Sequence, residues 1–274
     1  MKRSARPALP FVRHEPRHGV LWLGRAYRMF RAAPLRWLLL LFIYYTLVAA
    51  AELGPWASIG TLVAPVLKPV FAVGFLAAAW TQERGGTPSI GLLFRGFRSN
   101  LWALLPLGIV FLAGMTLAVL ATALVDGGQL ISLLSGSEKP TDEIFSSGRV
   151  QLAMLFGAAC ALPTLLALWF APALVVFNDA NAITALGTSL RAALANWRPV
   201  AVFGLTVFLY GGVLPAFIVS IARLVSAEVA AIVAIALVMP YAFAFLATFQ
   251  IADYVAYRDV FHADEPPATP TLSA

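Results

Sequence analysis

The chain has little charge and almost no cysteine. Of its 274 residues only 12% are charged and 61% are hydrophobic, and Cys160 is the single cysteine. Soluble domains carry roughly 25% charged residues, so this composition excludes an ordinary water-soluble protein. One cysteine also excludes an intramolecular disulfide and a cluster of thiolates around a metal ion. With a mean hydropathy of +0.84, the chain is expected to be an integral membrane protein.

Residue types that carry catalysis or bind metals are scarce in the apolar part of the chain. The three histidines, His14, His18 and His262, lie near the two ends. Glu52 and Asp253 lie near the ends of apolar runs. No HExxH pair, Gly-rich phosphate loop or G-x-S-x-G motif occurs. We therefore expect no catalytic residues, no cofactor and no metal site, and we expect that the chain is not an enzyme.

Six apolar runs are each long enough to cross a bilayer as a helix, which takes about 20 residues. They are residues 37–53, 59–80, 101–125, 150–177, 200–221 and 229–252. A cleaved signal peptide is the alternative for the first run, because small residues follow it, but the basic region before it is far too long. The predicted fold class is all-α: a polytopic membrane protein with six transmembrane helices.

A short motif occurs three times. Aligned on a glycine, the copies read GRAYRMFRAAP, GLLFRGFRSNL and GTSLRAALANW. Their fifth position is always arginine, as Arg28, Arg95 and Arg191, and their tenth position is Ala33, Asn100 and Asn196. Each copy precedes two apolar runs. We predict three repeats, each an amphipathic interfacial helix followed by two spans, with units 18–80, 87–177 and 181–255.

The repeated arginines are the first candidate site. Each lies near the end of an amphipathic helix that leads into a span, where the helix macrodipole and an anionic leaflet both favour a cation. We predict that Arg28, Arg95 and Arg191 contact anionic headgroups, either as independent anchors or together around a pseudo-threefold axis. The net charge of +6 then indicates membrane lipids as the partner and not nucleic acid. Protein partners are left open.

Lys68 is the second candidate, as an intramembrane charge. It lies deep in an apolar run between Pro65 and Pro69. A charge inside a span often marks a functional site, but a lysine can also extend its apolar stem and place its amine nearer an interface. The second interpretation is favoured, and the first stays open.

Charge also predicts the topology. If both termini and the amphipathic connections share one side, that side holds 15 of the 19 basic residues, and Lys68, Lys139, Arg149 and Arg223 are the exceptions. The positive-inside rule then places both termini in the cytoplasm. Residues 1–17 are predicted to be a flexible basic tail, 18–255 one six-span domain, and 256–274 a disordered polar tail.

The segment FAPALVVFND, followed by ALGTSLRAALANW, resembles a family of uncharacterised bacterial six-helix inner-membrane proteins over most of residues 19–255. It is also loosely similar to the membrane domain attached to some glycerophosphodiester phosphodiesterases, whose catalytic domain has no counterpart here. The resemblance implies a fold and carries no functional residue. The predicted function is a non-enzymatic membrane protein that organises lipid or a partner complex. The alternative is a transporter or channel for a small or amphiphilic solute.

Overall fold

The computed structural model describes residues 10–53 and 57–262. Within these ranges the chain is helical and has no strand. Six helical segments are long and apolar enough to cross a membrane. They are Pro34–Leu53, Ala57–Glu83, Leu101–Asp126, Gly148–Phe177, Trp197–Arg223 and Ala227–Phe261. The predicted all-α polytopic fold with six spans is confirmed.

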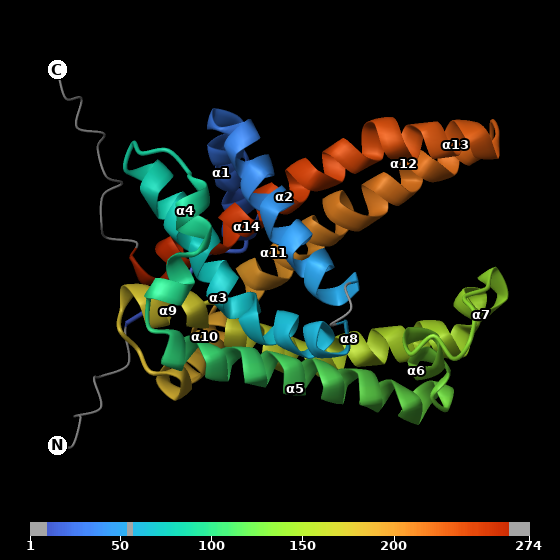
Figure 1. The fold of residues 1–274 in the computed structure, drawn as a ribbon, viewed down its shortest axis with the longest axis horizontal. Helices are drawn as coiled ribbons and strands as arrows, with labels where there is room; N and C mark the ends of the chain where they lie inside the picture. The colour runs from blue at the N-terminus through green and yellow to red at the C-terminus, as the bar shows by residue number, and fades with distance from the viewer. Residues whose placement is uncertain (1–9, 54–56, 263–274) are drawn as a thin grey trace.

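The six spans form three hairpins. The pairs are α2 (Pro34–Leu53) with α3 (Ala57–Glu83), α5 (Leu101–Asp126) with α8 (Gly148–Trp169), and α11–α12 (Trp197–Phe208, Leu214–Arg223) with α13–α14 (Ala227–Val233, Met239–Phe261). In Figure 1 the α5/α8 hairpin and the α12/α13 end of the third hairpin extend in different directions from one compact end. We call this end the base; it contains α1 (His18–Ala32), α4 (Ile90–Leu93), η1 (Arg95–Arg98), α9 (Ala171–Phe177), α10 (Ala182–Ala195) and the C-terminal halves of α3 and α14.

A short helical segment precedes each hairpin, in the order that the sequence predicted: α1, then α4 with η1, then α10. The second segment is not one regular helix, because η1 is a 3-10 turn. It begins at Ile90, directly after Ser89. The third is capped by Asn181, whose side chain accepts from the Thr184 N–H. Whether the three units are structural copies of one another stays a prediction.

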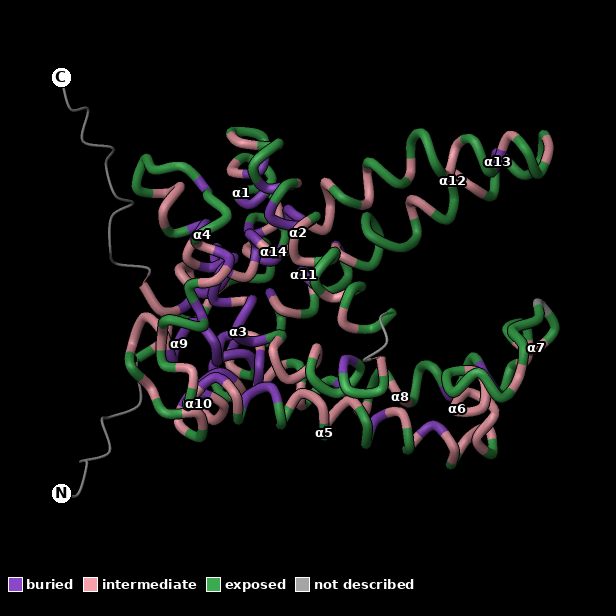
Figure 2. The backbone as a smooth tube through the Cα atoms, viewed as in Figure 1, coloured by how far each residue is buried: buried purple, intermediate pink, exposed green. Residues whose placement is uncertain are grey.

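The hydrophobic core lies in the base, and the far ends of the hairpins are exposed (Figure 2). Helix α3 is its centre because glycines let neighbouring backbones approach it closely. A Cβ on Gly74 would lie 2.3 Å from the Leu93 carbonyl oxygen, and one on Gly108 would lie 1.9 Å from that of Val66. Small residues at such positions are the usual means by which membrane helices pack.

Both helices of the third hairpin contain a π-helical segment: η2 (Leu209–Val213) and η3 (Ala234–Val238). Each lies just before a proline, Pro215 or Pro240. Proline cannot donate to the preceding turn and its ring crowds that turn, which explains the local widening. The Tyr241 hydroxyl donates to the Tyr210 carbonyl at 2.7 Å and joins the two helical arms of the hairpin.

The connection after α5 and the C-terminal end of α14 both contain helix beyond the predicted apolar runs. The polar connection at 126–149 contains two short helices, α6 (Gln129–Leu134) and α7 (Asp142–Ser146). At the C-terminal side, α14 continues to Phe261, so residues 256–261 are helical and not a disordered tail. They are helical because Tyr257 and Val260 pack into the base core. Residues 263–274 lie outside the described ranges.

Candidate functional site

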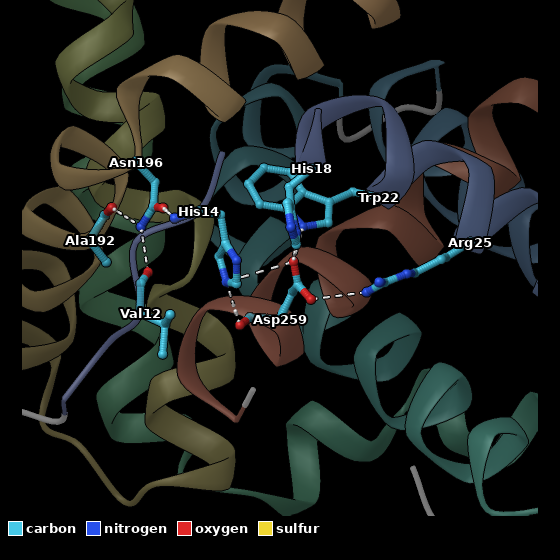
Figure 3. A network of polar contacts seen from close by, with 8 residues as sticks. All are labelled: Val12, His14, His18, Trp22, Arg25, Ala192, Asn196 and Asp259. Carbon is cyan, nitrogen blue, oxygen red and sulfur yellow. Dashed lines mark hydrogen bonds and ion pairs between the residues drawn. The ribbon is translucent and has the colours of Figure 1, made fainter. Parts of the chain in front are cut away.

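A polar cluster joins the start of the chain to its last helix (Figure 3). Asp259 on α14 is its centre. His18 Nδ1 lies 2.6 Å from Asp259 Oδ2, and the Trp22 indole N–H donates to the same oxygen at 2.8 Å. Arg25 donates to Oδ1 at 2.9 Å, and His14 Nε2 lies 2.8 Å from the Asp259 carbonyl oxygen. Because residues 18, 22 and 25 recur at helical spacing, α1 presents three of these groups on one face.

The segment before α1 is fixed by a second set of hydrogen bonds. Asn196, buried at the end of α10, accepts from the His14 backbone N–H at 2.8 Å and donates to the Val12 carbonyl at 2.9 Å. The Val12 N–H in turn donates to the Val260 carbonyl at 2.8 Å. Residues 10–17 are therefore not the flexible tail that the sequence predicted, because their backbone bonds to α10 and α14. Residues 1–9 of that predicted tail lie outside the described ranges.

The ligand atoms of His14, His18 and Asp259 lie within 4.8 Å of one another, so a metal ion must be considered. A metal bound to an imidazole lies near the plane of the ring. The two rings are stacked, with centroids 4.3 Å apart and planes at 28°, so one ion cannot lie near both planes. Trp22 and Arg25 also donate to the carboxylate oxygens. In this geometry the cluster is a hydrogen-bonded tie between the two ends of the domain.

Sequence reasoning missed this cluster because it set the histidines aside as residues of the chain ends. His14 and Asp259 are 245 positions apart. The spacing of His18, Trp22 and Arg25 was the one local signal, and it does not identify the carboxylate that these residues contact.

A second polar cluster lies where α3 ends. Arg258 forms an ion pair with Glu83, and the Tyr254 hydroxyl donates to the same carboxylate at 2.6 Å. The neighbouring Gln82 accepts from the Trp37 indole N–H at 2.7 Å and donates to the carbonyl of Met29 in α1 at 2.8 Å. The two acidic side chains Glu83 and Asp259 are thus both occupied by partners inside the base.

Lys68 and Asp253 are two opposite charges within the spans. The Lys68 amine lies 4.4 Å from the centroid of the Phe111 ring, and Asp253 accepts from the Trp169 indole N–H at 2.9 Å. The two ionisable residues lie on α3 and α14, which are in contact. The sequence placed Asp253 at a span end; because α14 continues to Phe261, Asp253 instead lies inside that helix.

The three repeated arginines are all exposed, on α1, η1 and α10. Arg191 donates to the Gly187 carbonyl of its own helix at 3.1 Å. Among the described residues, no ion pair involves Arg28, Arg95 or Arg191, and no contact joins them to one another. Their binding of headgroups, separately or together, stays a prediction.

Comparison with known proteins agrees with this architecture. The chain is 29% identical over 256 residues to a "Probable inner membrane protein" of Burkholderia thailandensis, covering 91% of this chain and 93% of that protein. Together with the six apolar helices, this similarity supports that the chain described here is a multi-pass inner-membrane protein. No family model and no solved structure matches the chain. The similarity to the membrane domain of glycerophosphodiester phosphodiesterases is therefore not supported.

Proposed function

We propose that this inner-membrane protein organises lipid or partner helices in the bilayer and does not catalyse a reaction. One observation carries the proposal: the part of the third hairpin that extends away from the base is almost entirely exposed. In the most apolar window of each of its two spans, 6% of residues are buried inside the protein, against 50% for the span of α3. The base holds the protein together, and this hairpin presents its side chains to whatever surrounds it.

The exposed side chains of this hairpin are large and apolar. They include Phe208, Tyr210, Phe217, Ile232, Ile235 and Leu237. Exposed apolar surface of this extent marks contact with a membrane or with another protein. Lipid chains or the helices of a partner can cover it, and a chain that holds such a surface apart from its own core is suited to arranging them.

The spans offer few free polar groups that would line a path for a solute. The hydroxyls of Thr122, Thr206 and Thr248 each donate to a carbonyl one turn earlier in their own helix, at 2.7 to 2.8 Å. Their hydrogen-bonding capacity is used locally. This supports an organising role over transport.

Photo-crosslinking tests the proposal directly. A benzophenone amino acid placed at Phe217, which is 60% exposed, is expected to form adducts with lipid or with a second protein in native membranes. The same probe at Phe170, which is fully buried, is the control and is expected to react only within the chain. If the Phe217 probe also reacted only within the chain, the hairpin would have no free face and the proposal would fail.

A transporter or channel for a small or amphiphilic solute is the second candidate, and the presence of two ionisable residues within the spans, Lys68 and Asp253, favours it. Charges within spans mark ion and substrate paths in many transporters. As a structural residue, Lys68→Met is expected to leave folding and expression nearly unchanged, because methionine keeps most of the apolar stem. A Lys68→Met protein that is stable but reproduces every defect of the null strain would instead support a transport site, as would the same result for Asp253→Asn.

We also propose that the base and both termini face the cytoplasm, since most of the exposed arginines lie on that side, with Arg149 and Arg223 at the far ends of the hairpins as exceptions. In a Cys160→Ala background, Ser137→Cys at the far end of the α5/α8 hairpin is expected to react with an impermeant maleimide in intact spheroplasts. Ser89→Cys, exposed on the base, should react only after permeabilisation. The opposite pattern would reverse the topology.

A further inference from the structure

Three exposed arginines at the edge of the base lie over exposed aromatic rings. The guanidinium carbon is 4.4 Å from the ring centroid in the closest pair, 5.4 Å in the next and 6.0 Å in the last. We call these pairs the interfacial pairs; in that order they are Arg84 with Trp80, Arg198 with Trp197, and Arg31 with Tyr27.

Each interfacial pair lies where the base meets a span. Arg31 is in the last turn of α1, just before α2, Arg84 follows α3, and Arg198 is in the first turn of α11. Their rings are 40% to 60% exposed, so they cover little of the protein core. Tryptophan and tyrosine at such junctions mark the headgroup layer of a bilayer. The cations at the far ends of the hairpins have no ring beneath them among the described residues; they are Lys139, Arg149 and Arg223.

The positive charge of the pairs is not neutralised within the described part of the chain. None of Arg31, Arg84 and Arg198 takes part in an ion pair there. Glu83 precedes Arg84 directly, but its carboxylate is held by Arg258 and Tyr254. Internal pairing of the acidic residues therefore leaves these arginines available to an anion from outside.

Two of the pairs flank one fixed junction. Gln82 bonds both to the Met29 carbonyl in α1 and to the Trp37 indole in α2, which fixes the end of α1 against the end of α3. Arg31 and Arg84 lie two residues beyond Met29 and Gln82 respectively. The positions of their backbones are thus set before any ligand binds.

From this arrangement we propose that the interfacial pairs bind the phosphate groups of anionic phospholipids in the cytoplasmic leaflet. A guanidinium donates two parallel hydrogen bonds to a phosphate, and the adjacent ring packs against the glycerol region at the same depth. Leu35, four residues after Arg31, is an exposed apolar side chain that suits an acyl chain. The inference rests on the proposed lipid-organising function and names its ligand. The arginines that it selects differ from the repeated Arg28, Arg95 and Arg191.

The test uses the full chain in nanodiscs of phosphatidylcholine, with or without phosphatidylglycerol. The first variant combines Arg31→Gln, Arg84→Gln and Arg198→Gln. The control combines Lys139→Gln, Arg149→Gln and Arg223→Gln, and so removes the same charge from the far ends of the hairpins. The measurements are the phosphatidylglycerol retained after extraction, counted by native mass spectrometry, and the rise in melting temperature that this lipid causes.

The arginine variant is expected to lose the retained phosphatidylglycerol and the rise in melting temperature. Its apparent affinity for this lipid should fall roughly 5-fold per arginine, because each basic residue near an anionic surface gains about 1 kcal/mol of attraction. The control should keep both. Should the triple variant fail to fold, Arg84→Gln alone tests the closest pair.

Retention unchanged in the arginine variant, or lost equally in the control, would overturn the inference. An equal rise in melting temperature with inorganic phosphate in plain phosphatidylcholine would identify free phosphate as the ligand and would overturn it too. In each of these cases the crosslinking of Phe217 is unaffected, so the proposed function is judged separately.

Discussion

Asp259→Asn removes the negative charge that holds the start of the chain against α14. The substitution keeps the size of the side chain. It replaces one of two acceptor oxygens by an amide N–H donor, although His18, Trp22 and Arg25 all approach these oxygens at 2.6 to 2.9 Å. At least one donor therefore loses its acceptor.

The expected decrease in the free energy of unfolding follows from how exposed each partner of Asp259 is. Arg25 is 43% exposed, so its pair with Asp259 contributes at most about 1 kcal/mol. The Asp259 side chain is 12% exposed and Trp22 is fully buried, and a hydrogen bond to a charged group in such surroundings contributes about 1.5–3 kcal/mol. Because these bonds share one carboxylate, they do not add fully. We expect Asp259→Asn to lower the free energy of unfolding by about 3 kcal/mol.

Unfolding by sodium dodecyl sulfate in mixed micelles measures the loss, and limited proteolysis reports release of residues 10–17. Glu15→Gln is the matched control, because it removes the same charge from an ion pair with Arg17 whose side chains are 69% and 74% exposed. It should cost less than about 1 kcal/mol. If Asp259→Asn were no more destabilising than Glu15→Gln, the tie would not stabilise the fold and our reasoning would be refuted.

Two further substitutions have controls within the chain. Asn196→Ala should destabilise the fold by about 1–3 kcal/mol and expose the segment near Val12 to protease, because it leaves buried backbone groups unbonded. Asn100 occupies the matching motif position but is exposed, so Asn100→Ala should have almost no effect. Equal effects of the two substitutions would contradict the role of Asn196 in fixing this segment. Gly108→Ala should disrupt the contact of α5 with α3 and lower the yield of folded protein, since the added Cβ meets a carbonyl. Gly204→Ala is the control: its added Cβ meets open space, so it should stabilise the helix by about 0.5–1 kcal/mol. A Gly108→Ala protein that folds as well as the parent would show that the packing of α5 against α3 is wrong.

The sequence predicted the six spans because that information is local. Burying a polar backbone in lipid requires continuous apolar helices, so hydropathy alone places them, and all six occur in the structure. The ends of the spans depend on tertiary contacts as well. Helix α14 continues to Phe261 beyond the predicted end at 252 because Tyr254 and Arg258 find a partner in Glu83, a contact that no local pattern contains.

Composition and hydropathy by themselves determined that this protein lies in a membrane, that it is helical and that it has six spans, since each property depends on residues within one stretch of chain. Tertiary structure alone decided which polar groups meet. His14 and Asp259 are 245 positions apart, and Glu83 and Tyr254 are 171 positions apart. It also decided which arginines form ion pairs, because an arginine is paired with a carboxylate according to the side chains that folding brings beside it, and not according to its neighbours in sequence.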